Sequence, residues 1–201
     1  MSTFPPIQDL DTTISHIEVL VNTHDIIAER YAIIQGCMPD QTQRLDDPVR
    51  LHGFACFLML QSIFDFGMAQ LLHLLASQMV FDATELHTPK ASNLQFVEDK
   101  LKKLEYVSKL FDSNIWKKIK TLSVVRNTVA HGVGWSDVSW QQEELEFLAQ
   151  AGFINGTSAT LMGPVHSFRL LPNMPNRCAK IYCEAIRLAH QEFSGNYNAN
   201  P

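Results

Sequence analysis

Apolar residues recur at helical intervals over most of this chain, and polar stretches containing glycine or proline separate the periodic segments. The pattern predicts helices over residues 9–35, 48–80, 93–111, 113–132, 141–151 and 176–193. Pro48 suits the first turn of the second helix, and Gly132 suits the end of the fourth. We therefore expect an all-α fold, an antiparallel bundle of four to five long helices.

The periodic pattern weakens between residues 133 and 175. An Asn-Gly pair at 155–156 is a turn signal, and apolar and polar residues partly alternate over 165–170, which together predict a small β-hairpin. We expect 133–175 to form an irregular or hairpin-containing insertion before the last helix. Residues 194–201 should be a flexible tail. The length of 201 residues fits a single domain.

The first two helices carry apolar residues that we expect to face the core. On the first helix the stripe consists of Ile14, Ile17, Val21, Ile26 and Ile33. The segment from Phe54 to Val80 is also apolar, but five polar residues interrupt it: Gln61, Asp65, Gln70, His73 and Gln78. Its longest unbroken apolar stretch is too short to span a bilayer. We interpret this segment as a core helix and expect no membrane partner.

Composition narrows the class of protein. Apolar residues make up 46% of the chain and charged residues 18%, which favours a folded core over disorder. The net charge of −5 excludes a wholly basic nucleic-acid binder but leaves room for a locally basic surface. The four cysteines lack metal-ligand spacing, and no signal peptide is evident, so we expect reduced thiols and a cytoplasmic location. No histidine set or glycine-rich loop suggests a metal or a cofactor.

One short segment, Arg126 to Gly132, carries the candidate chemistry. Arg126 falls in the middle of the apolar face of its helix, while Asn127, His131 and Lys120 share a polar face roughly 100–140° away. Arg126 and His131 therefore do not converge on a rigid helix. Either the helix unwinds at its end, or two copies of the helix meet in a dimer.

Asp65 presents a similar case on the second helix, where it lies within an apolar stripe. An isolated charge is costly to bury, so the simplest expectation is that Asp65 pairs with Arg126. Such a pair has two interpretations: it belongs to a site, or it only neutralises two charges inside the fold.

Lysines are concentrated between residues 100 and 120, ahead of Arg126, whereas acidic residues cluster elsewhere. This asymmetry suggests a basic cleft for a polyanion, with Lys103, Lys117 and Lys120 as candidate RNA contacts. Trp135 and Trp140 could stack on unpaired bases. The alternative interpretation is an ordinary solvated lysine face, with Trp135 and Trp140 packed over the end of the bundle.

The Arg-Asn-x-x-x-His spacing of Arg126, Asn127 and His131 resembles the signature of the HEPN superfamily of helical domains, which includes many metal-independent RNases. The resemblance covers residues 9–132 and the last helix. It implies a composite site between two protomers, with an acidic residue supplied by the helix of Asp65. Glu98 and Asp99 are weaker candidates for that acidic residue.

The resemblance implies a homodimeric, metal-independent endoribonuclease that cleaves RNA by attack of the 2′-hydroxyl. Family analogy suggests a toxin or phage-defence effector with an antitoxin partner. Arg126 would bind the phosphate, Asn127 would orient it, and His131 would transfer a proton. Val133 stands where some relatives carry an adenylylated tyrosine. Two alternatives stay open: a non-catalytic HEPN-like module that binds RNA, a nucleotide or a protein, and a helical scaffold in which Arg126 only pairs with Asp65.

Overall fold

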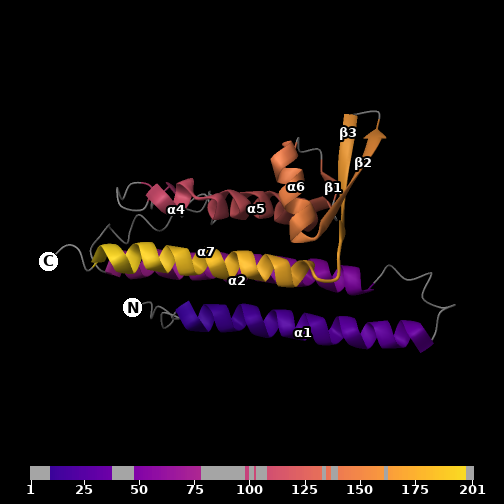
Figure 1. The fold of residues 1–201 in the computed structure, drawn as a ribbon, viewed down its shortest axis with the longest axis horizontal. Coiled ribbons are helices and arrows are strands. Elements are labelled where there is room, and N and C mark those ends of the chain that lie inside the picture. Colours follow the sequence, from indigo (N-terminus) through magenta and orange to yellow (C-terminus); the bar gives the residue numbers. More distant parts are fainter. Residues whose placement is uncertain are drawn as a thin grey trace.

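The computed structural model is mostly helical, as the sequence predicts (Figure 1). It describes residues 10–37, 48–77, 98–99, 102, 108–132, 135–136, 140–160 and 163–197. The four long helices are α1 (Leu10–Cys37), α2 (Pro48–Ser77), α5 (Asn114–Gly132) and α7 (Met174–Tyr197). Two short helices are α4 (Ser108–Asp112) and α6 (Gln142–Ala151). The predicted helix over 93–111 falls largely outside the described residues.

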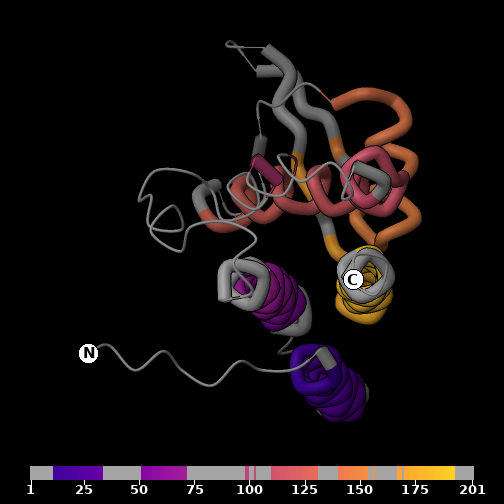
Figure 2. Tube along the Cα trace, turned by 90° about the vertical axis from the view of Figure 1, so that its left-hand side faces the viewer, coloured from indigo at the N-terminus to yellow at the C-terminus, as the bar shows by residue number. Residues whose placement is uncertain are grey.

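The long helices lie in layers. α1 forms one outer layer, α2 and α7 lie side by side in the middle, and α5 crosses them on the side away from α1 (Figures 1 and 2). α1 runs in the opposite direction to both α2 and α7 (Figure 1). The central pair is therefore covered on both sides, which places the main core between α2, α5 and α7.

The start of α5 follows from its local sequence. The Ser113 hydroxyl accepts a hydrogen bond from the backbone amide of Trp116 (3.2 Å), so Ser113 supplies a partner for one of the free amides at the helix start. Gly132 ends the helix. The predicted span from 113 or 114 to 132 is confirmed.

Large aromatic side chains hold the central layers together. Phe64 of α2 is fully buried, and its ring centroid lies 5.2 Å from that of Tyr182 on α7 and 6.5 Å from that of Trp116 on α5. Burying each such side chain stabilises the fold by about 1.5–3 kcal/mol. One aromatic cluster therefore connects three helices that are distant in sequence.

The segment of α2 from Leu51 to Leu71 is long and apolar enough to cross a membrane, judged by length and composition only. In the structure its side chains Phe57, Leu60 and Phe64 are completely buried against the neighbouring helices. This packing agrees with the predicted core helix.

The insertion is more regular than the sequence pattern indicates. Strands β1 (Trp135–Ser136), β2 (Phe153–Thr160) and β3 (Gly163–Leu170) form an antiparallel sheet in the order β1-β3-β2. The predicted hairpin is present, but its turn is not at 155–156. Both residues lie within β2, where Gly156 pairs with Ser167, and the strands connect after Thr160.

Gly156 is needed for close packing rather than for a turn. A Cβ at this position would lie 3.0 Å from the Ser167 hydroxyl oxygen, and that hydroxyl donates to the Gly156 carbonyl (3.2 Å). The glycine allows this approach between two strands. The Asn-Gly turn signal therefore gave a wrong prediction at Gly156, because the conformation of this residue depends on its partner Ser167 in the neighbouring strand.

Two further expectations are wrong. Ile26 and Ile33 of the predicted α1 core stripe are exposed (57% and 63%), whereas Ile14, Ile17 and Val21 are buried. Val19, Ile26 and Ile33 are seven positions apart and lie on the face of α1 opposite the core. The predicted tail also begins as helix, because α7 continues to Tyr197. Ala189 is the last buried residue among those of α7 whose side chains are described, and the helix continues beyond it.

Candidate functional site

Arg126 lies half-buried on α5, in line with buried side chains of that helix, as the helical arithmetic predicts. Its charge is close enough to the half-buried Asp65 on α2 to lower the pKa of that carboxyl group. Within the described part of the chain, the direct ion pairs are those of Glu98 with Lys102 and Lys120. The predicted Asp65–Arg126 pairing is therefore an electrostatic interaction at longer range than a direct ion pair.

A chain of hydrogen bonds extends from Asp65 to the core. The Tyr182 hydroxyl on α7 donates to Gln61 Oε1 (2.7 Å), and Gln61 Nε2 donates to Asp65 Oδ1 (2.8 Å). Tyr182 is completely buried, and Gln61 is 1% exposed. These bonds fix one carboxylate oxygen of Asp65 and link α7 to α2. We call Tyr182, Gln61, Asp65 and Arg126 the polar relay.

The relay continues to the next residue of the motif. Arg126 Nη1 donates to Asn127 Oδ1 (2.9 Å), and Asn127 is exposed. The guanidinium group therefore lies between a half-buried carboxyl on one helix and an exposed amide on its own helix. His131 lies in the last turn of α5, but its side chain is outside the described part of the structure, as is that of Trp135.

The surroundings shift the proton affinity of two relay members. Burial raises the pKa of Asp65, and this effect outweighs the hydrogen bond from Gln61 and the Arg126 charge, which both lower it. Burial, with Cys178 and Asp65 nearby, raises the pKa of Tyr182 well above its ordinary value. Tyr182 therefore stays a neutral donor, while Asp65 binds a proton more readily than a free carboxyl group.

Glu98 has a different environment from Asp65. It is 1% exposed and accepts hydrogen bonds from Trp116 Nε1 (3.2 Å) and Lys120 Nζ (2.7 Å), and it also pairs with Lys102 (2.5 Å). Burial by itself would raise the pKa of Glu98, but the bonds from Lys102, Lys120 and Trp116 outweigh it and lower that pKa. Glu98 and Lys120 are therefore bound to each other and do not join the polar relay. Asp99, the other weaker acidic candidate, is exposed.

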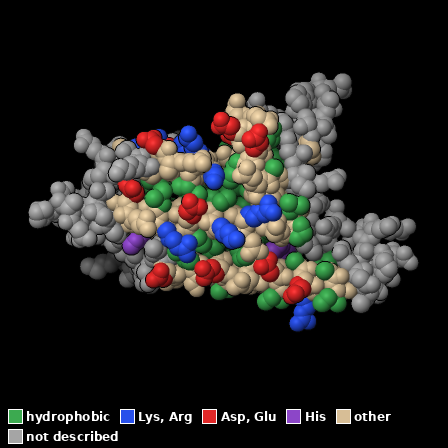
Figure 3. Space-filling view, viewed as in Figure 1, with side chains coloured by type: hydrophobic (Ala, Val, Ile, Leu, Met, Phe, Trp, Pro, Cys, Tyr) green, Lys and Arg blue, Asp and Glu red, His purple; other side chains and the backbone are tan. Residues whose placement is uncertain are grey.

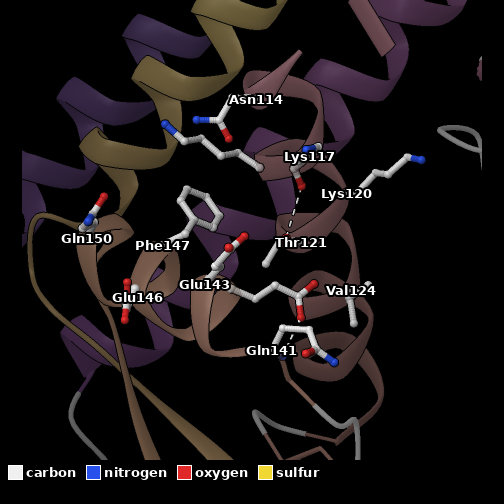
Figure 4. Close-up of a pocket in the computed structure, with 12 residues that line it drawn as sticks. Asn114, Lys117, Lys120, Thr121, Val124, Gln141, Glu143, Glu146, Phe147 and Gln150 are labelled. Carbon is white, nitrogen blue, oxygen red and sulfur yellow. Dashed lines mark hydrogen bonds between the residues drawn. The ribbon is translucent and has the colours of Figure 1, made fainter. Parts of the chain in front are cut away.

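Lys117 lies on the far side of α5 from Arg126. Nine positions separate them, which is about two and a half helical turns, so their side chains leave the helix in opposite directions. Lys117 lines a groove of about 520 Å³ between α5 and α6, shown in Figure 4. The structure thus separates Lys117 from the relay, and Lys103 lies outside the described residues.

The groove is balanced in charge. Lys117, Lys118 and Lys120 line it together with three glutamates of α6: Glu143, Glu144 and Glu146. Phe147 lies between the two sides, and Lys120 points away from it (Figure 4). Lysine and acidic side chains also intermingle across the face seen in Figure 3. A uniformly basic cleft is not found on these described surfaces, because acidic side chains from other elements are interspersed with the lysines.

Trp140 packs in the interior. It is 9% exposed, and its ring meets the Phe168 ring edge to face, with centroids 5.6 Å apart. This contact agrees with the structural interpretation of Trp140 and removes it from the candidates for base stacking.

A second unusual polar cluster lies where α1 meets α2. The His24 and His52 rings stack with centroids 5.0 Å apart, and the buried atoms His24 Nδ1 and His52 Nε2 lack hydrogen-bond partners. His24 Nε2 lies 3.3 Å from the Pro172 carbonyl oxygen. The described residues contain no group of three or more side chains arranged to hold a metal ion. These two histidines therefore contribute to helix packing.

Sequence reasoning identified Arg126, Asn127 and Asp65 but missed Tyr182. The available signal was a phenol on the inward face of the last helix, since a buried tyrosine hydroxyl usually finds a hydrogen-bond partner. The sequence pattern marks Gln61 only as an interruption of an apolar run. The relevant feature is that Gln61 lies four residues before Asp65, so the two side chains are neighbours on the helix and can form a hydrogen bond.

Comparison of this chain with protein-family models, with curated proteins and with solved structures finds no match. The resemblance to HEPN domains therefore rests on the residues of the motif.

Proposed function

We propose that this protein is a metal-independent endoribonuclease of the HEPN type, with Arg126, Asn127 and His131 as its catalytic residues. The observation that supports the proposal most strongly is the half-buried Arg126, set against a carboxyl group whose pKa burial raises. A charged group next to a carboxyl group with a shifted pKa is typical of functional sites. His131 follows Arg126 by five positions on the same helix. In this proposal α1, α2, α5 and α7 constitute the helical bundle of that superfamily.

Each residue has a defined task in the proposed reaction. The RNA 2′-oxygen attacks the adjacent phosphorus, the bond to the 5′-oxygen breaks, and a 2′,3′-cyclic phosphate forms. Arg126 stabilises the negative charge that develops on the phosphate, and Asn127 orients the guanidinium group or the phosphate. His131, in the last turn of α5, donates a proton to the leaving 5′-oxygen, and water accepts the proton of the 2′-hydroxyl. Asp65 is a positioning residue that holds Arg126.

A second copy of the chain completes the proposed site. On an ideal helix, Arg126 and His131 of one copy diverge, so two copies of α5 bring an arginine of one to a histidine of the other. Phe66, next to Asp65 on α2, is 43% exposed and provides apolar surface for this contact. The proposed cellular role is that of a cytoplasmic toxin or defence effector, held inactive by a protein antitoxin.

The test is cleavage of single-stranded RNA and tRNA in the presence of EDTA, with analysis of the product ends. We expect wild-type protein to leave 2′,3′-cyclic phosphate, and His131→Ala and Arg126→Ala to abolish cleavage. Lys180→Ala is the control, because it removes an exposed cation from another helix, α7, and should retain activity. Circular dichroism of each variant establishes that it is folded.

Two results would count against the proposal. If wild-type protein leaves all RNA intact, or if His131→Ala cleaves as well as wild type, the protein is not this nuclease. If Arg126→Ala instead lowers the free energy of unfolding while RNA remains intact in every sample, Arg126 has a structural role only.

A further inference from the structure

The outer face of α1 carries an exposed apolar stripe that the fold does not use. Val19, Ile26 and Ile33 are 60%, 57% and 63% exposed. They are seven positions apart, which is close to two full turns, so their side chains lie in a row along the helix. One apolar residue every seven positions gives a narrow apolar row, with polar Asn22 and Glu29 between its members. We call these three residues the α1 stripe.

The stripe faces away from the rest of the described molecule. The buried residues Ile14, Ile17 and Val21 lie on the other side of α1. The long helices that pack on α1 are α2 and α7, and both cover that buried side (Figures 1 and 2). The α1 stripe is therefore additional to the core, and its exposure costs solvation free energy that a partner would recover.

Acidic side chains line one flank of the stripe. Glu18 and Asp25 directly precede Val19 and Ile26, and Glu29 follows in the next turn; all three are exposed. Arg30, also exposed, lies on the other flank. Along the α1 edge of Figure 3, hydrophobic, acidic and basic side chains lie next to each other. In paired helices, charges beside the apolar row select the partner, and acidic residues select a basic one.

A groove of about 380 Å³ opens beside the middle of the stripe. Asp25, Ile26 and Glu29 of α1 line it opposite Asn176 at the start of α7. Asn176 Nδ2 donates to both carboxylate oxygens of Asp25 (2.7 and 2.9 Å), which fixes this carboxylate at the groove. A lysine or arginine from a partner helix would meet a prepositioned negative charge here.

We propose that the α1 stripe is the docking surface for a basic amphipathic helix of a protein partner. The partner's apolar residues would pack on Val19, Ile26 and Ile33, and its lysines or arginines would meet Glu18, Asp25 and Glu29. Glu18, Asp25 and Glu29 would repel an anionic membrane surface.

The probe is a synthetic amphipathic peptide with leucine at the heptad a and d positions and lysine or arginine at e and g. Its mirror carries glutamate at e and g. Fluorescence anisotropy measures binding of each labelled peptide to the full chain. We expect the basic peptide to bind at least about tenfold more tightly than the acidic one, with affinity that falls as salt rises.

Variants locate the binding site. Ile26→Gln/Ile33→Gln should weaken binding of the basic peptide about tenfold or more, and Glu18→Lys/Glu29→Lys should reverse the preference between the two peptides. Met59→Gln is the matched control, because Met59 is a similarly exposed apolar residue (54%) on α2. All substituted positions are exposed, so the variants should remain folded.

Three results would overturn the proposal: equal binding of both peptides, binding that Ile26→Gln/Ile33→Gln leaves unchanged, and absence of binding. A fourth such result could come from sedimentation of the chain alone. If the chain self-associates and Ile26→Gln/Ile33→Gln abolishes this association, the α1 stripe binds a second copy instead. Binding to anionic vesicles that the same variant abolishes would assign it to a membrane. RNA cleavage is not part of any of these readouts, so failure here leaves the nuclease proposal unaffected.

Discussion

The hydroxyl group of Tyr182 provides the sharpest test of the polar relay. Tyr182→Phe removes only the donor to Gln61 Oε1, because the aromatic ring and its packing against Phe64 remain. Gln61 is 1% exposed, so water does not replace the lost partner. A buried acceptor left without a hydrogen bond costs about 1–3 kcal/mol. We expect Tyr182→Phe to lower the free energy of unfolding by that amount. In a chain of this length, each kcal/mol lowers Tm by about 2–4 °C.

The assay is urea unfolding followed by tryptophan fluorescence and far-UV circular dichroism. Tyr31→Phe is the matched control, since Tyr31 is partly exposed on α1 and its loss of a hydroxyl should change the free energy of unfolding by less than about 0.5 kcal/mol. Gln61→Leu removes the acceptor of the same bond. The double variant Tyr182→Phe/Gln61→Leu should lose less than the sum of the two single variants, because the residues share one interaction.

Two results would refute the stabilising role of the Tyr182–Gln61 hydrogen bond. One is a free energy of unfolding for Tyr182→Phe within about 0.5 kcal/mol of wild type, and the other is additivity of the two single effects. Either result would mean that the hydrogen bond between α7 and α2 contributes nothing to stability. The hydrogen bond between Gln61 and Asp65 would then be independent of α7.

Two further predictions concern packing away from the relay. Burial, and secondarily the His24 charge, lowers the pKa of His52 below 6.5, so the unfolded chain binds more protons at mildly acidic pH. The free energy of unfolding should therefore fall as pH drops from about 7 to 5, a fall that His52→Gln should reduce and that a flat profile in wild type would refute. Gly152 adopts φ +97° at the end of α6, and a Cβ there would lie 2.9 Å from Met174 Cα. Gly152→Ala should destabilise the fold by more than about 1 kcal/mol, and an unchanged urea midpoint would contradict this.

Most helix spans were predictable because helix formation depends on residues a few positions apart. Pro48, Ser113 and Gly132 mark helix boundaries through their own backbone and capping chemistry, and the observed helices begin or end at or beside them. The position of Arg126 within the buried face of α5 follows from the same short-range periodicity. The exposure of Ile26 and Ile33 was also within reach, since their spacing from Ile17 and Val21 places them on the other side of α1.

The sequence by itself determined the helical character of the chain, the apolar face that holds Arg126 and the charged residue Asp65 within a core helix. Only the tertiary structure decided which groups meet: Tyr182 with Gln61, 121 positions apart, and Lys120 with Glu98, 22 positions apart. It also decided that Gly156 belongs to a strand. The physical reason is that periodicity sets the direction of a side chain on its own element, whereas its partner depends on how distant elements pack.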